Sequence, residues 1–151
     1  RFVPSDAAAV SGARMFVGMR GNMAAPTNVE PSTLTNSIGV AQLSTSNNLH
    51  LVYGGSAAQA AIDLGAGFPA NGASTVAYEL ELFASPMTQT IGYKVTRLDT
   101  GTVASGTLSG TAGTAVPGAT TLLAHAAWRT NNATLLACGL DVVQIYLETD
   151  N

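Results

Sequence analysis

The stretch from Thr75 to Leu108 most constrains what this chain can fold into, because it reads as three antiparallel strands in a row. Apolar and polar residues alternate in Ala77–Ala84 and again in Ile91–Leu98, which is the period of a half-buried strand. Asp99-Thr100-Gly101 fits a short hairpin loop with Gly at the left-handed position. Thr102–Leu108 follows as a weaker third strand. This meander predicts an all-β fold.

One register of the first hairpin places apolar pairs on one face and an opposite-charge pair on the other. Its pairs are Ala84–Ile91, Leu82–Tyr93, Leu80–Val95 and Glu81–Lys94. Each such pair stabilises a sheet by roughly 0.2–1 kcal/mol. A register slipped by two residues keeps the faces equally consistent, so the sequence leaves the exact pairing open.

Further β-patterned runs, separated by turn-rich segments, occupy the rest of the chain. They are Ala13–Arg20, Leu34–Leu43, Leu49–Tyr53, a short strand or corner at Ile62–Leu64, Thr120–Ala127 and Leu135–Thr149, the last bent at Gly139. Partial helical spacing in the last run is outweighed by its β-forming residues and its lack of a cap. Eight or nine short strands predict an all-β, two-sheet antiparallel β-sandwich with jelly-roll-like topology.

The alternation also predicts which residues face inward. In Ala13–Arg20, Met15, Val17 and Met19 share one face. In the next run, Ile38 and Val40 are expected to point inward on the same face as Leu34.

The length of 151 residues predicts one domain, large enough to bury about 68–70% of its unfolded surface without disulfides. We expect residues 1–12 to be a lead-in that joins the domain to whatever precedes it, and residues 13–151 to form a single sandwich. The chain starts with Arg1 and not with Met, which indicates a processed or truncated piece of something longer.

Charged residues are scarce, at 10% of the chain against roughly 25% in an average soluble domain. A surface of Ser, Thr, Asn, Gln and Gly suits packing against identical copies or contact with neutral glycans, although it also suits a robust β-protein with no partner. The net charge of −3 and the lack of a basic patch argue against nucleic acid and anionic membranes as partners. No apolar run is long enough to insert into a membrane.

No residue pattern indicates catalysis, a metal or a cofactor. His50 and His125 lack metal-ligand spacing, and Cys138 in its apolar run is expected to be a small core residue. Glu79 and Glu81 share one face of a strand, which is compatible with a carboxylate pair but typical of an ordinary outer face.

Asp141 alternates with apolar residues, on a face with Val143, Ile145 and Leu147. A buried carboxylate needs a partner, so we predict an ion pair with Arg14, Arg97 or Arg129, or bonds to backbone amides. We expect this contact to be structural, with a subunit interface as the alternative.

Trp128-Arg129-Thr130-Asn131-Asn132 is the most site-like stretch, interpreted as a loop. A lone Trp, an Arg and two Asn supply a stacking face and paired hydrogen-bonding groups, as sugar recognition requires. Trp128, Arg129, Asn131 and Asn132, with Tyr53 as a second aromatic, are therefore the candidate ligand-binding residues. A Trp at a strand end is also typical of a core edge or a subunit interface.

The order of phrases and turns over most of residues 13–151 resembles a domain at the C-terminal end of tailed-bacteriophage virion proteins, especially tail-fibre and fibre-tip proteins. The phrases are MFVGMRGNMAAPTNVEPSTLTNSIGVAQL, IDLGAGFPANG, AYELELFASP, IGYKVTRLDTGTVASGTL, TLLAHAAWRTNNAT and DVVQIYLETDN. The resemblance implies an all-β knob at the distal end of a fibre, usually a homotrimer, that helps the virion attach to a bacterial surface. It brings no site motif to place on individual residues.

The expected function is therefore a non-enzymatic fibre-tip domain that binds a host-surface glycan or protein as a homotrimer, beside other virion proteins. It would be made in the bacterial cytoplasm and located on the virion, at the tail or fibre tip. One alternative is a purely structural decoration or trimerisation module. Another is a polysaccharide-degrading domain that uses Glu79 and Glu81.

Overall fold

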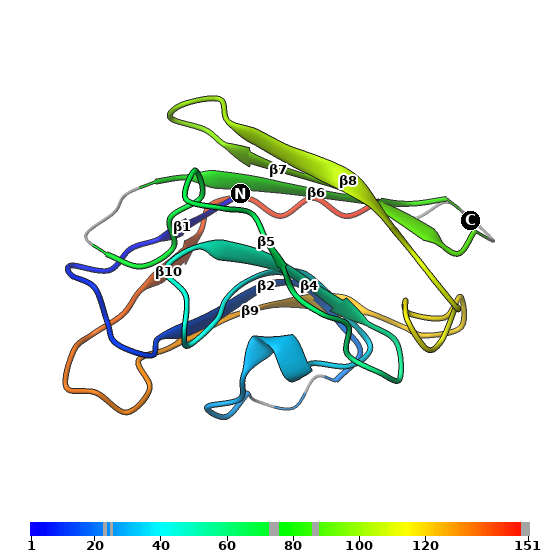
Figure 1. Ribbon diagram of the computed structural model, residues 1–151, viewed down its shortest axis with the longest axis horizontal. Helices are drawn as coiled ribbons and strands as arrows, with labels where there is room; N and C mark the ends of the chain where they lie inside the picture. The colour runs from blue at the N-terminus through cyan, green and yellow to red at the C-terminus, as the bar shows by residue number, and fades with distance from the viewer. Residues whose placement is uncertain (23, 25, 73–75, 86–87, 149–151) are drawn as a thin grey trace.

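The structure is a computed structural model that describes residues 1–22, 24, 26–72, 76–85 and 88–148. Its ten strands form two antiparallel sheets of five strands each, which face one another as two layers (Figure 1). The predicted all-β, two-sheet antiparallel sandwich is confirmed. Among the described residues, no helix has the length and hydropathy of a membrane span.

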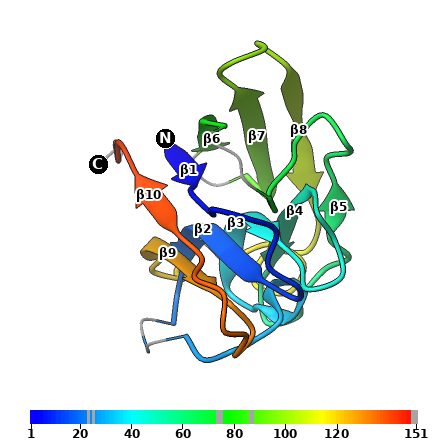
Figure 2. The same ribbon diagram turned by 90° about the vertical axis from the view of Figure 1, so that its left-hand side faces the viewer.

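Sheet A has the strand order β10-β1-β6-β7-β8, and sheet B has the order β5-β4-β3-β2-β9. The strands of sheet A are β1 (Phe2–Pro4), β6 (Tyr78–Ala84), β7 (Thr90–Arg97), β8 (Val103–Ser109) and β10 (Leu140–Val142). Those of sheet B are β2 (Arg14–Arg20), β3 (Ser37–Gln42), β4 (Leu49–Gly54), β5 (Ile62–Asp63) and β9 (Ala124–Thr130). Thus β2–β5 and β6–β8 are two meanders. Strand β9 completes sheet B next to β2, and β1 together with β10 completes sheet A next to β6 (Figure 2).

The open register of the first hairpin is resolved between β6 and β7. Leu80 pairs with Val95, and Leu82 pairs with Tyr93 on the inner face. Glu81 pairs with Lys94 on the outer face, where Lys94 Nζ lies 2.7 Å from Glu81 Oε1. The predicted register is therefore the one the chain adopts.

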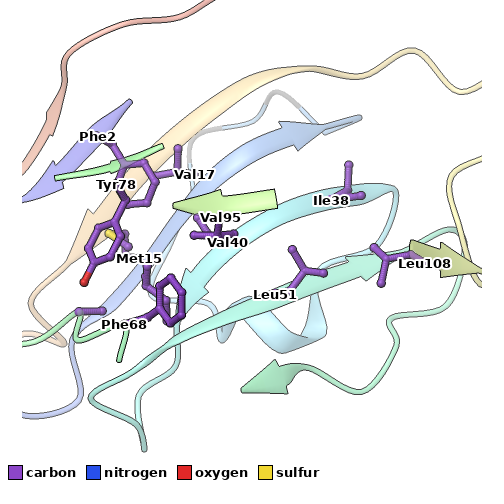
Figure 3. Packing of buried hydrophobic residues seen from close by; sticks show 12 residues of the cluster. Phe2, Met15, Val17, Ile38, Val40, Leu51, Phe68, Tyr78, Val95 and Leu108 are labelled. Carbon is purple, nitrogen blue, oxygen red and sulfur yellow. The ribbon is translucent and has the colours of Figure 1, made fainter. Parts of the chain in front are cut away.

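The main core lies between the two sheets. Figure 3 shows its side chains pointing toward one another from both layers. Its buried members are Phe2, Met15, Val17, Ile38, Val40, Leu49, Leu51, Phe68, Ala70, Tyr78, Val95 and Leu108. Burial raises the pKa of Tyr78 to about 12, and its hydroxyl donates to the carbonyl of Pro69. Period-two alternation thus supplies the apolar inner faces of β2, β3, β4, β6 and β7.

A second cluster buries the outer face of sheet B. It consists of Phe16, Leu34, Ala41, Val52 and Trp128, and the short 3-10 helix η1 (Pro31–Thr33) precedes Leu34. Leu34 therefore lies on the opposite side of the sheet from Ile38 and Val40, where we had placed it with them. The reason is that β3 begins only at Ser37, so strand alternation does not extend back to Leu34.

Three further predicted segments differ from the structure. The expected lead-in contributes β1 to sheet A and buries Phe2 and Val10, so residues 1–12 belong to the sandwich. The strand expected at Thr120–Ala127 begins at Ala124 and continues to Thr130. The long last strand shortens to Leu140–Val142, because its only ladder partner, β1, has three residues. Its predicted last residue, Thr149, lies outside the described residues.

Two glycines let β2 and β3 approach closely at the centre of sheet B. Gly18 pairs with Gly39, and a Cβ added at Gly18 would lie within 3.0 Å of the backbone of Ile38 and Gly39. Backbone atoms cannot move aside as a flexible side chain can, so this site excludes any side chain.

We therefore expect Gly18→Ala to lower the free energy of unfolding by about 1–3 kcal/mol, as overpacking of a core does. Gly92→Ala in β7 is the matched control, since its added Cβ would meet its nearest atom at an ordinary 3.7 Å. Urea unfolding of both variants measures the difference. Equal stabilities for the two variants would contradict the close approach of β2 and β3.

Candidate ligand-binding surfaces

Trp128 and Arg129 lie within β9 and not in the loop that we predicted. Neighbouring residues of a strand point to opposite faces of its sheet. Trp128 pairs with Phe16 and belongs to the outer cluster, whereas Arg129 pairs with Met15 and points into the interior. The two side chains therefore cannot contact one ligand on the same face.

Trp128 is only 9% exposed. Its ring stacks on Phe16 with 6.4 Å between the ring centroids and an angle of 27° between the planes. A Trp at the edge of a core was the alternative to sugar stacking in the sequence analysis. The structure shows this core-edge packing. The indole face is occupied by the protein itself.

Arg129 forms a buried ion pair with Asp6, and the two side chains are 2% and 0% exposed. Arg129 Nε donates to Asp6 Oδ1 at 3.0 Å, and Nη2 donates to Asp6 Oδ2 and to the carbonyl of Ala70. The backbone N–H of Gly139 also donates to Asp6 Oδ1, at 2.9 Å. The charges are thus paired and hydrogen-bonded, as burial requires.

The predicted ion pair of Asp141 is wrong. Among the described residues no basic side chain lies within 4.0 Å of its carboxylate, which is exposed on the edge strand β10. The alternation that suggested burial is real, but β10 has only three paired residues and its surroundings are open to solvent. The arginine pairs instead with Asp6, which is distant in sequence and carries no local signal.

Cys138 is half-buried close to this pair and is not the core residue we expected. Burial raises the pKa of its thiol. A thiol in this state carries little thiolate at neutral pH and is a weak nucleophile.

Asn131 and Asn132 are engaged within the chain. Asn131 Nδ2 donates to the carbonyls of Thr134 and Leu136, which closes the turn after β9. Asn132 Oδ1 accepts from Arg14 Nη1 at 2.8 Å and from Asn28 Nδ2 at 2.9 Å. The side-chain amide of Asn131 stabilises the turn after β9, and that of Asn132 connects this turn to the loop that contains Asn28.

Arg14 is the centre of this second polar network. Its Nε donates to Glu30 Oε2 at 2.8 Å, and Glu30 Oε1 accepts from the backbone N–H of Ser44. Although burial raises the pKa of Glu30, the hydrogen bonds from Ser44 and Arg14 lower it below its ordinary value overall. Through these hydrogen bonds, Arg14 of β2 holds the loop before η1 against the outer side of sheet B.

Tyr53 lies on the inner face of sheet B, opposite to Trp128. It pairs with Ile38 and packs against the main core. The five residues predicted to bind a ligand are therefore not brought together within one chain, and whether any of them binds a ligand stays a prediction.

The outer face of sheet A carries an open hollow of about 400 Å³ that sequence reasoning did not identify. Its lining includes Glu81, Phe83, Lys94, Ser105 and Thr107 from three adjacent strands. Phe83 is 68% exposed beside the Glu81–Lys94 pair. An exposed aromatic ring among hydrogen-bonding groups is a surface that can hold a sugar. The available signal was the position of Phe83, which shares its strand face with Glu79 and Glu81.

The two carboxylates of that face are held separately. Glu79 pairs with Arg1 at 2.8 Å, and Glu81 pairs with Lys94. Each carboxylate therefore has its own cation.

The histidines are also apart from one another. His50 on β4 has its Nδ1 3.1 Å from the carbonyl of Asn48, while His125 lies on β9. Burial lowers the pKa of His125, and so does the nearby N-terminal ammonium. Within the part of the chain that the structure describes, no three His, Cys, Asp or Glu side chains are grouped to hold a metal ion.

The segment after β10 exposes large apolar side chains. Its Val143, Ile145, Tyr146 and Leu147 are between 51% and 76% exposed, and Val142 at the end of β10 is 42% exposed. Val143 and Gln144 bond to the backbone of Arg1, but residues 145–148 form no backbone hydrogen bond to another strand among the described residues. Figure 2 shows this segment in red, leaving β10 at the edge of the molecule.

Comparison with protein-family models, with curated proteins and with solved structures found no match to this chain.

The buried pair gives a stability prediction. Asp6→Asn keeps the side-chain shape but leaves Arg129 uncompensated, so we expect a loss of about 3–5 kcal/mol of unfolding free energy. Asp99→Asn is the matched control, because it breaks the exposed pair with Arg97 and should lower the stability far less. Urea unfolding at neutral pH compares them. Similar losses in both variants would show that the Asp6 pair is not a major support of the fold.

Proposed function

We propose that this chain is a non-enzymatic tip domain of a bacteriophage virion fibre, which attaches the virion to its bacterial host as a homotrimer. The observation that carries the proposal is the exposed apolar segment after β10. The resemblance of the chain's phrases to fibre-tip domains supplies the biological setting. The bound host molecule would be a surface glycan or protein.

The apolar segment supports self-association. Monomeric proteins rarely leave contiguous large apolar patches in water, and such patches commonly mark interaction sites. The residues from Val143 to Leu147 include no charge, and they directly follow the edge strand β10. An extended, uncharged, apolar segment can add to a sheet edge or pack against copies of itself. Further copies of the same chain are therefore the proposed occupant.

A trimer would make weak host contacts effective. Three identical sites on one rigid tip bind a repetitive surface with an avidity well above that of a single site. The scarcity of charge, 10% of residues, keeps repulsion between identical copies low.

The outer face of sheet A is the proposed host-contact surface. Sheet B is covered on both faces, whereas Phe83 and its polar neighbours on sheet A are open to solvent. Phe83 can stack on the apolar face of a sugar ring, while Ser105 and Thr107 offer hydroxyl groups.

Size-exclusion chromatography with light scattering tests the assembly. We expect a particle of three times the chain mass of 15.3 kDa, and dissociation to monomers when Ile145→Glu and Leu147→Glu are combined. Burying two carboxylates in an apolar interface carries a large desolvation cost. The combination of Leu122→Glu and Leu135→Glu adds the same charge at exposed leucines elsewhere and should leave the trimer intact. A monomer at every concentration would contradict the proposed assembly.

Cell binding tests attachment. We expect the fluorescently labelled protein to bind at least one strain in a panel of bacteria, with unlabelled protein competing. Phe83→Ala should weaken this binding several-fold because the stacking face is removed, while Leu122→Ala should not. A trimer that binds no strain would instead favour the structural decoration module.

A further inference from the structure

Strand β8 is a sheet edge without the usual protection against pairing with another chain. It lies at the end of sheet A, where only β7 pairs with it. Its seven residues, VASGTLS, include no charge and no proline, and five of them are exposed. The register with β7 runs without interruption from Thr90–Ser109 to Thr96–Val103, so no bulge twists this edge away. Charges, prolines and bulges are the devices that ordinarily block the pairing of an edge strand.

The edges at the other ends of the two sheets are protected. Strand β5 has two residues and β10 has three, and each includes an aspartate, Asp63 or Asp141. Strand β9 is as long as β8, but its Arg129 points inward and is buried with Asp6. Short edges, edge charges and inward-pointing charges all oppose the addition of a further strand. An added strand is therefore best accommodated at β8.

The hydrogen-bond phase of β8 shows which backbone groups are open. The N–H of Arg97 donates to the carbonyl of Thr102 at 2.8 Å, one step beyond the register pair Thr96–Val103. Bonded and non-bonded pairs alternate along an antiparallel ladder. The alternate residues Val103, Ser105 and Thr107 consequently direct their N–H and C=O groups away from β7. No described residue hydrogen-bonds to the backbone of these three on that side.

The same chain carries an unpaired segment suited to this edge. Val143–Leu147 follows β10, which ends sheet A on the side opposite to β8 (Figure 2). Every second residue of the segment is aliphatic, namely Val143, Ile145 and Leu147, and each of these is more than half exposed. In a strand, these three side chains would share one face, as the inner face of a sandwich requires.

The dimensions and the chemistry of the two segments agree. At roughly 3.4 Å per residue, five residues span about 17 Å and the seven of β8 about 24 Å, so the segment fits within the edge. The inner face of β8 carries the small Ala104 and Gly106 beside Leu108, so the core is thin there. Three aliphatic side chains added beside them would extend the core. Neither segment has a charge that would repel the other.

We propose that the Val143–Leu147 segment of one copy adds to β8 of the next copy as a further strand of sheet A. This inference rests on the proposed homotrimer and names the surface through which its copies join. The donor and the acceptor lie at opposite ends of one sheet, so the contact is head-to-tail. A head-to-tail contact closes into a ring when the rotation between copies allows it, and each copy then gives and receives one strand.

Hydrogen exchange of the unaltered protein tests the contact. In the assembled protein we expect the amides of Val103, Ser105 and Thr107 to exchange slowly, because they donate to the added strand. They should exchange fast when Ile145→Glu and Leu147→Glu are combined, since the donor segment is then lost. The amides of β7, which has a strand on each side, should stay protected in both proteins and serve as the internal control.

A proline on the edge tests the acceptor. Ser105→Pro removes one outward N–H and puts a ring in its place, which an edge strand tolerates. We expect light scattering to show loss of the trimer and a particle of one chain mass, 15.3 kDa. Ser105→Val keeps the N–H and removes only the hydroxyl, so it should leave the trimer intact. If Ser105→Pro fails to fold, the exchange of the unaltered protein decides.

A peptide tests the donor in isolation. The Ile145→Glu, Leu147→Glu variant keeps an unaltered β8, so a fluorescent peptide of residues 141–148 should bind it saturably, as measured by anisotropy. The same peptide with Ile145→Glu should not bind. Adding Ser105→Pro to the protein should abolish the binding.

The outcomes separate this inference from the proposed function. A trimer that persists in folded Ser105→Pro would overturn strand addition at β8 and leave the trimer standing. Fast exchange of the three outward amides in an assembled trimer would do the same. A protein that is monomeric at every concentration would overturn both proposals.

Discussion

The buried ion pair between Asp6 and Arg129 is the contact on which the arrangement of the two sheets depends. Arg129 lies on β9 in sheet B, while Asp6 follows β1 in sheet A. The same pair bonds the carbonyl of Ala70 and the N–H of Gly139, so it gathers both connecting segments at this end of the sandwich. A buried charge is costly without its partner, so these segments are held in one arrangement.

The sandwich is asymmetric, and this asymmetry decides which surfaces can act. Sheet B is buried on both sides, by the main core and by the cluster around Phe16 and Trp128. Sheet A packs on one side only, and its other face carries Phe83 and the Glu81–Lys94 pair in solvent. The bare face and the apolar segment after β10 are therefore the surfaces that we propose for a host molecule and for further copies of the chain.

The candidate site was harder to anticipate than the fold. Trp128, Arg129, Asn131 and Asn132 are neighbours in sequence, and composition alone suggested a shared binding loop. Extension of β9 to Thr130 sends Trp128 and Arg129 to opposite faces, and each finds a partner from a remote segment. Phe83 is distinguished only by its exposure, which depends on what the rest of the chain covers.

By itself the sequence determined the all-β class, most of the strands and the inward faces of β2, β6 and β7, and it reduced the central hairpin to two registers. These follow from local alternation and from pairs such as Glu81–Lys94, which lie only 13 residues apart. Tertiary structure alone decided that Asp6 and not Asp141 pairs with an arginine, that residues 1–12 join sheet A, and that the last strand stops at Val142. The physical reason is that burial and pairing depend on which distant segments meet, and Asp6 and Arg129 are 123 residues apart.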